Sequence, residues 1–202
     1  MMNTLRFHVL GDSLAAGVGC TRADQTLGHR LSDTLRRAGH QVDLSLHAVS
    51  GARSTDLAPQ VRSATAAGVD LALVVIGAND LISFTPPQAG ARLLGEAVRG
   101  LTGTGAAVVV ATTPDLSIVT AVPEPFRDVV RQVSAAYAQA QADAVDRAGG
   151  SVAAVGAELF DSFRANPALF SGDRFHPSPA GYALIADALA PHLLTAATRH
   201  AA

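Results

Sequence analysis

The chain has 202 residues, of which 49% are hydrophobic and 16% charged, with a formal net charge of −2. A chain of this length and hydrophobicity can bury a full core, which excludes an intrinsically disordered protein. Its 15 basic residues, all arginine, nearly balance 17 acidic ones and form no basic run, so we expect no nucleic-acid partner. The single cysteine, Cys20, cannot form an internal disulfide, and we interpret it as a packed side chain.

The N-terminal residues lack the apolar stretch and the small-residue cleavage site of a secretory signal. No later apolar run reaches about 18 residues, the length needed to span a bilayer. We therefore expect a soluble, cytoplasmic protein without a membrane span. No linker, repeat or low-complexity tract divides the chain, so we predict one domain over residues 1–202.

Short apolar runs rich in β-branched residues alternate with Ala-, Leu- and Arg-rich stretches of helical spacing. We predict buried parallel strands over 7–10, 42–49, 71–76, 106–111 and 152–155. We predict helices over about 25–38, 54–67, 87–101, 127–148 and 179–197. This alternation indicates an α/β fold, a flavodoxin-like three-layer α/β/α sandwich with a five-stranded parallel sheet. Two segments without clear periodicity, 114–125 and 159–174, are predicted to be loops that line a substrate site.

The turn after the first strand contains Gly11, Asp12 and Ser13. In an open α/β sheet, ligands bind beyond the carboxyl ends of the strands, so such turns are where chemistry is expected. Gly11 permits a tight turn that would expose the Ser13 hydroxyl as a nucleophile. Asp12 is interpreted as structural. A phosphate-binding loop over 11–19 is the alternative, although its glycine spacing fits neither common phosphate-binding pattern.

The next two turns offer groups that can donate hydrogen bonds to a developing oxyanion. These groups are the backbone N–H of Gly51 and the side-chain amide of Asn79. The structural alternatives are a plain turn glycine and an asparagine that caps a helix or turn. Asp80 is predicted to begin a turn or helix. Arg53 is predicted to be solvated, with binding of an anionic leaving group as the alternative.

Asp173 and His176 precede the last predicted helix. An Asp can bind Nδ1 of a His three residues later, which leaves Nε2 free to act as a base. Alternatively, Asp173 caps a turn and His176 is a surface residue. Serine, glycine, asparagine and this pair together supply a nucleophile, oxyanion donors and a base at one sheet edge. No metal is expected, because the other histidines lack metal-ligand spacing: His8, His29, His40, His47, His192 and His200.

On these motifs the chain resembles the SGNH hydrolases, the GDSL-type esterases and lipases. The motifs that match the first, second, third and fifth family blocks, in family order, are Gly11-Asp12-Ser13-Leu14, Ser50-Gly51, Gly77-Ala78-Asn79-Asp80 and Asp173-Arg174-Phe175-His176-Pro177. The resemblance implies that Ser13 is the nucleophile, His176 the general base and then acid, and Asp173 the residue that orients the imidazole. It also implies an acyl-enzyme intermediate, no cofactor, and an oxyanion hole formed by the N–H groups of Ser13 and Gly51 and by the Asn79 amide.

A small-molecule ester is therefore the expected substrate. Apolar residues beside the motifs are candidates for the acyl site: Leu14, Leu81, Leu116 and Phe175, with Ile82, Phe84, Ile118 and Phe126 as further candidates. Aromatic residues make up only 4% of the chain, which favours small or medium acyl esters. The resembled family also includes lysophospholipases, thioesterases and carbohydrate deacetylases. Outside it, the alternatives are a non-catalytic α/β binding module and a flavodoxin-like nucleotide binder.

Overall fold

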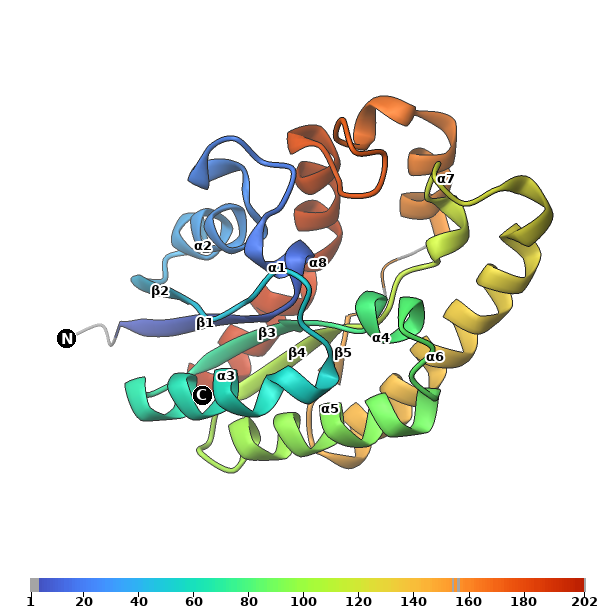
Figure 1. Cartoon of the computed structure of the whole chain (residues 1–202). Helices are drawn as coiled ribbons and strands as arrows, with labels where there is room; N and C mark the ends of the chain where they lie inside the picture. Colours follow the sequence, from blue (N-terminus) through green and yellow to red (C-terminus); the bar gives the residue numbers. More distant parts are fainter. Residues whose placement is uncertain (1–3, 154, 156, 202) are drawn as a thin grey trace.

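A five-stranded, all-parallel sheet forms the centre of the protein (Figure 1). The structure, a computed structural model, describes residues 4–153, 155 and 157–201. The strand order is β2-β1-β3-β4-β5, which confirms the predicted α/β fold. The strands are β1 (Leu5–Gly11), β2 (Val42–Leu46), β3 (Leu71–Val75), β4 (Ala107–Ala111) and β5 (Ser151–Val152).

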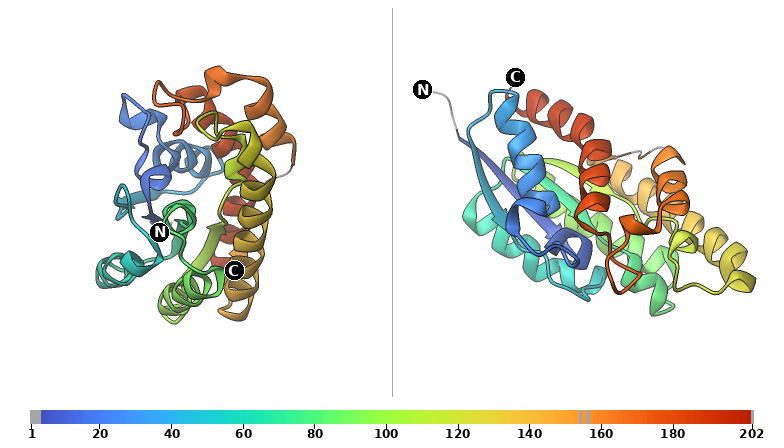
Figure 2. Two further views of the ribbon diagram at one scale, coloured as in Figure 1. Left: turned by 45° about the vertical axis from the view of Figure 1, so that its right-hand side comes forward. Right: turned by 90° about the horizontal axis from the view of Figure 1, so that it is seen from above.

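Helices cover both faces of the sheet (Figures 1 and 2). One face carries α2 (Leu27–Arg37) and α8 (Pro179–Ala201), and the other carries α3 (Leu57–Ala67), α5 (Pro87–Thr102) and α6 (Arg127–Arg147). Successive strand side chains point to opposite faces, so Leu73 joins the core beneath α2 and α8 while Val74 joins the core beneath α3 and α5. Because both faces are buried, these strands are continuously apolar rather than alternating.

Several short elements connect the main ones. These are α1 (Ser13–Ala16), α4 (Ala78–Ile82) and the 3₁₀ turns η1 (Ala23–Gln25), η2 (Ser54–Asp56), η3 (Leu116–Ile118), η4 (Glu124–Phe126) and η5 (Pro167–Leu169). The predicted fifth strand is observed only as Ser151–Val152, and residue 154 of that prediction lies outside the described residues.

The predicted loop over 159–174 is wrong in its first half, because α7 (Ala157–Ala165) occupies it. Leu159 and Phe163 recur at helical spacing and pack into an apolar cluster with Phe170. Nine residues are too few for a convincing periodic pattern in the sequence, and tertiary packing stabilises the helix.

One described helix, α8, bears on the expectation about membrane spans. Its segment Pro179–His200 has 22 residues and a mean hydropathy of 1.2, which is sufficient to cross a membrane by length and composition. In the structure this helix lies against the sheet and α2, and Leu189, Leu193 and Ala197 are buried there. In the apolar window of this helix 39% of the residues are buried, so packing in the core accounts for part of its apolar composition.

Candidate active site

Ser13, His176 and Asp173 form a continuous chain of polar contacts. Oγ of Ser13 lies 2.9 Å from Nε2 of His176, and Nδ1 of the same imidazole lies 2.6 Å from Oδ2 of Asp173. Ser13 and His176 are 163 positions apart in the sequence. The fold therefore brings together a hydroxyl, a base and a carboxylate that the chain places near its two ends.

A buried glutamine, Gln60, holds the turn that contains Ser13. Gly11 has a φ of +133°, and a Cβ at this position would overlap the carbonyl oxygen of Val75, so only glycine fits. The Gln60 side chain on α3 accepts a hydrogen bond from the Gly11 N–H at 2.7 Å and donates one to the Gly11 carbonyl at 3.0 Å. No sequence motif indicated a functional role for Gln60. The available signal was a polar residue between Leu57 and Ala64 on the inward face of a helix.

Asp12 has a structural place in this turn. It is the N-cap of α1, and its carboxylate accepts a hydrogen bond from the N–H of Leu14 at 3.0 Å. Burial raises the pKa of Asp12 to about 6, although the hydrogen bond from Leu14 and the charge of His176 act in the opposite direction. The cap starts the helical turn at Ser13.

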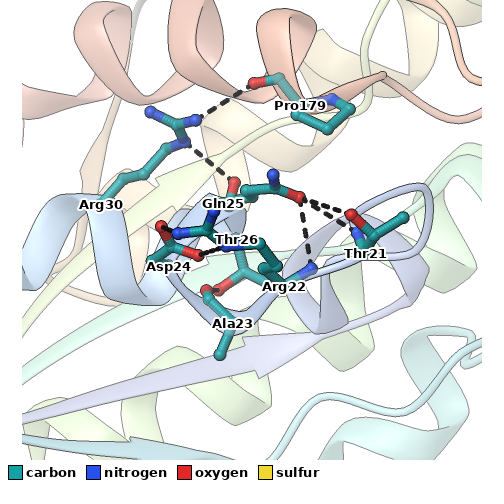
Figure 3. Close-up of polar contacts among 8 residues, drawn as sticks. All are labelled: Thr21, Arg22, Ala23, Asp24, Gln25, Thr26, Arg30 and Pro179. Carbon is teal, nitrogen blue, oxygen red and sulfur yellow. Dashed lines mark hydrogen bonds and ion pairs between the residues drawn. The ribbon is translucent and has the colours of Figure 1, made fainter.

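Long-range contacts place the His176 loop over Ser13. A Cβ at Gly19 would overlap the carbonyl oxygen of Pro177, so the loop after α1 packs closely on the residue that follows His176. The Tyr182 hydroxyl donates to the Val18 carbonyl at 2.8 Å. Figure 3 shows a further link, in which Arg30 donates both to the Gln25 carbonyl at 2.9 Å and to the Pro179 carbonyl at 3.3 Å.

A polar cluster within the same loop orders η1, which precedes α2. The Gln25 side chain accepts hydrogen bonds from the backbone N–H and the hydroxyl of Thr21 and from the N–H of Arg22 (Figure 3). Cys20 lies beside this cluster, half-buried against the core, and burial raises the pKa of its thiol. The thiol is thereby kept in its neutral form, in keeping with a packed side chain.

Asn79 contacts the loop that contains Gly51 (residues 49–53, the Gly51 loop). Asn79 lies inside α4, whose N-cap is Gly77, so it does not cap that helix. Its side-chain amide donates to the Ala52 carbonyl at 3.0 Å. An amide nitrogen carries two hydrogens, so one remains for a bound oxyanion. Gly51, the neighbour of Ala52, has a φ of +81° with open space around it, so its backbone conformation is what favours glycine here.

Asp80, predicted to begin a turn or helix, also binds a residue of another segment, Ser54. Its buried carboxylate accepts hydrogen bonds from the backbone N–H of Ser54 at 2.9 Å and from the Ser54 hydroxyl at 3.1 Å. Burial raises the pKa of Asp80, while the bonds from Ser54 and the charge of Arg53 counteract this rise. Arg53 itself is exposed.

An apolar cavity of about 390 Å³ adjoins Ser13 and His176. Leu14, Leu116, Ile118 and Phe175 line it, together with three phenylalanines that the sequence did not suggest: Phe160, Phe163 and Phe170. The remaining candidates lie elsewhere. Leu81 packs against an apolar cluster that includes the cavity residues Leu116, Phe163 and Phe170, but it is not itself among the described residues that line the cavity. Ile82, Phe84 and Phe126 are exposed, with Phe84 reaching 93%.

Comparison with known proteins gives a consistent result. A family model described as GDSL-like lipase/acylhydrolase matches residues 9–184. A GDSL-like esterase of Mycobacterium tuberculosis is 40% identical over 185 residues, which cover 90% of this chain and 59% of that protein. The chain thus spans less than two-thirds of this relative's length.

Solved structures share the same fold. A candidate SGNH hydrolase from Slackia heliotrinireducens has 26% identity and a TM-score of 0.67, with 94% of this chain and 98% of that chain covered. A catalytic mutant of an acetylxylan esterase from Geobacillus stearothermophilus has a TM-score of 0.74 at 17% identity, with 96% of each chain covered. At that lower identity the likeness concerns the fold.

Proposed function

Because the chain belongs to the GDSL-like lipase/acylhydrolase family, we propose that it hydrolyses carboxylic esters with Ser13 as the nucleophile. The observation that supports this role most directly is the contact chain from Ser13 through His176 to Asp173, with distances of 2.9 Å and 2.6 Å. A serine hydroxyl is a weak nucleophile until an adjacent base accepts its proton, and Nε2 of His176 lies at hydrogen-bond distance to do so.

In the proposed reaction, Oγ of Ser13 attacks the ester carbonyl carbon while Nε2 of His176 takes the hydroxyl proton. Asp173 holds the opposite ring nitrogen and stabilises the positive imidazolium. The tetrahedral intermediate then collapses: its bond to the leaving alcohol breaks, and His176 returns the proton to that oxygen. In the second half, Nε2 of His176 takes a proton from a water molecule, whose oxygen attacks the acyl carbon. The bond from that carbon to Oγ of Ser13 then breaks, the imidazole returns the proton to Oγ, and the carboxylic acid leaves.

The oxyanion of the intermediate would be held by the N–H groups of Ser13 and Gly51 and by the Asn79 amide. The contact between Asn79 and Ala52 supports this role, since it places the amide beside the Gly51 loop before any substrate binds. Donors fixed in advance stabilise a developing charge without reorganisation at the moment of reaction.

The apolar cavity supports binding of a small or medium acyl chain. Phenylalanine occurs only seven times in the chain, and four of these residues line the cavity: Phe160, Phe163, Phe170 and Phe175. A low overall aromatic content therefore does not exclude an aromatic acyl site. A site of this volume lies at the lower end of the range for small-molecule pockets.

The proposal is tested with p-nitrophenyl esters from acetate to palmitate. We expect hydrolysis with the highest kcat/KM between butyrate and octanoate, and covalent labelling by a fluorophosphonate that is lost in Ser13→Ala. Acetylated xylo-oligosaccharides, included in the same panel, examine the deacetylase alternative. No turnover on any ester combined with no labelling at Ser13 would instead favour a non-catalytic binding module.

A further inference from the structure

Asp80 is a buried acid that the proposed reaction does not use. Asp80 is only 1% exposed to solvent, and its hydrogen-bond partner Ser54 is 2% exposed. Burying a carboxylate is unfavourable unless hydrogen bonds compensate for the lost water. Here two donors of a single residue, the N–H and the hydroxyl of Ser54, converge on Oδ2, whereas Oδ1 is buried with no hydrogen-bond partner among the described residues. This arrangement ties α4 specifically to the segment that follows Gly51.

The Gly51 loop is attached to its surroundings at several points. Ser50, Gly51 and Arg53 are exposed, whereas Ala52 is buried. Within the loop, the Ala52 N–H donates to the Val49 carbonyl at 3.1 Å. At the start of the loop the Val49 N–H donates to the Gly11 carbonyl at 3.0 Å, and at its end the Arg53 N–H donates to the Asp56 carboxylate at 2.8 Å. Consecutive residues of α4 hold the loop as well, because Asn79 binds the Ala52 carbonyl and Asp80 binds Ser54. These two contacts lie on either side of Arg53 and fix the course of the backbone just after Gly51.

We propose that Asp80 is a positioning residue, which holds the Gly51 loop against α4 so that the Gly51 N–H and the Asn79 amide form one preorganised oxyanion site. This inference rests on the proposed ester hydrolysis. Misplacement of a catalytic group by about 1 Å can cost on the order of a hundredfold in rate. Loss of the Asp80 contact frees the loop to move by such amounts, and the effect falls on the transition state, where the oxyanion exists.

The role requires an acceptor at Asp80 rather than a negative charge. A charge buried near an oxyanion opposes its formation, so the benefit of Asp80 must come from the hydrogen bonds that it accepts. Asparagine keeps a carbonyl oxygen that can accept from Ser54 and removes the charge. Asp80→Asn is therefore the conservative variant, and Asp80→Ala is the disruptive one.

The test measures kcat and KM on p-nitrophenyl butyrate, with kcat expressed per site titrated by a fluorophosphonate so that unfolded protein is not counted. For Asp80→Ala we expect kcat to fall about tenfold to a hundredfold, with KM within about threefold of the wild-type value. We expect Asp80→Asn to restore kcat to within about threefold of wild type. A kcat of Asp80→Ala close to the wild-type value, or an Asp80→Asn variant as impaired as Asp80→Ala, overturns the inference.

Ser54→Ala keeps the inference testable if Asp80→Ala does not fold. It removes the hydroxyl contact and retains the backbone contact, so we expect a smaller fall in kcat, about threefold to tenfold, at unchanged KM. Ser32→Ala, at a fully buried serine on α2, is the matched control and should leave kcat unchanged. If Ser54→Ala matches this control, Asp80 does not act through Ser54. If the wild-type chain hydrolyses no ester, the proposed function itself is contradicted. If the wild type is active and Asp80→Ala leaves its kcat unchanged, only the role of Asp80 is contradicted.

Discussion

Asp173 binds His176 through one carboxylate oxygen and holds its own turn through the other. Oδ2 lies 2.6 Å from Nδ1 of His176. Oδ1 accepts hydrogen bonds from the Ser171 hydroxyl at 2.7 Å and from the N–H groups of Phe175 and His176, both at 2.9 Å. Although burial alone would raise it, these hydrogen bonds hold the pKa of Asp173 well below its usual range. The carboxylate is therefore ionised at neutral pH.

This division of tasks predicts the effect of Asp173→Asn. An amide can still accept bonds within the turn, but it no longer offers a negative charge to the imidazolium, so we expect kcat to fall at least about a hundredfold. The measurement is kcat on p-nitrophenyl butyrate, with circular dichroism to verify the fold. Ser171→Ala is the comparison: it removes one partner of Oδ1 and should cost much less. Equal losses in the two variants would contradict a specific role for Oδ2.

Asn79→Ala tests the proposed oxyanion donor directly. Loss of one such donor typically costs about 2.7–4 kcal/mol of transition-state stabilisation, so we expect kcat to fall by roughly a hundredfold or more with a smaller change in KM. Because Asn79 also binds the Ala52 carbonyl, thermal unfolding of the variant should be measured beside its kinetics. Turnover near the wild-type value would exclude Asn79 from the oxyanion site.

The central sheet was predictable because its strands are continuously apolar and β-branched. Leu71–Val75, for example, is buried at every position, and such a run is typical of a parallel strand covered on both faces. The short helices α1 and α4 were not predictable in the same way. They have four and five residues, which is too few for a periodic pattern, and they exist because the turns that carry Ser13 and Asn79 are held by the surrounding structure.

The site was predictable where motifs carried it and unpredictable where packing built it. Four short motifs indicated Ser13, Asn79 and His176, but sequence alone could not measure the contact between residues 163 positions apart. Gln60 and Ser54 were missed, since a buried polar residue acquires its meaning from the backbone groups it meets in three dimensions. The aromatic lining of the cavity was missed for a related reason, because composition gives the number of phenylalanines but not their positions in the fold.

Ala138 provides a test of the acyl cavity. This small residue of α6 lines the cavity, so Ala138→Leu should fill part of it and shorten the acyl chain that fits. We expect the ratio of kcat/KM for octanoate to that for acetate to fall about tenfold or more, since one or more methylenes in an apolar site are worth about 1–3 kcal/mol each. Ala136→Leu, at an exposed position of the same helix, is the control and should leave the ratio unchanged. A ratio unaffected in both variants would place the acyl chain outside this cavity.

An ion pair far from the site links stability to acid pH. Arg6 donates to both oxygens of Asp70, from its side chain at 2.9 Å and 2.5 Å and from its backbone N–H at 2.8 Å. The hydrogen bond with Arg6 lowers the pKa of Asp70 to about 2, from an ordinary value of 3.8, despite the opposing effect of burial. The folded state therefore favours the ionised carboxylate. The resulting stabilisation is complete above about pH 4 and is lost as the pH falls toward 2.

Asp70→Asn should consequently destabilise the protein in a pH-dependent manner. Arg6 is about half exposed and solvent weakens the pair, so we expect the difference in unfolding free energy between wild type and variant to shrink by roughly 1–2 kcal/mol between about pH 6 and pH 2. Urea denaturation at several pH values measures this difference. Arg6→Met removes the same pair from the other side and should show the same trend. Only a group whose pKa differs between the folded and unfolded states makes stability depend on pH. If the difference in unfolding free energy between wild type and each variant stays constant across the pH range, the Arg6–Asp70 pair does not make stability depend on acid pH.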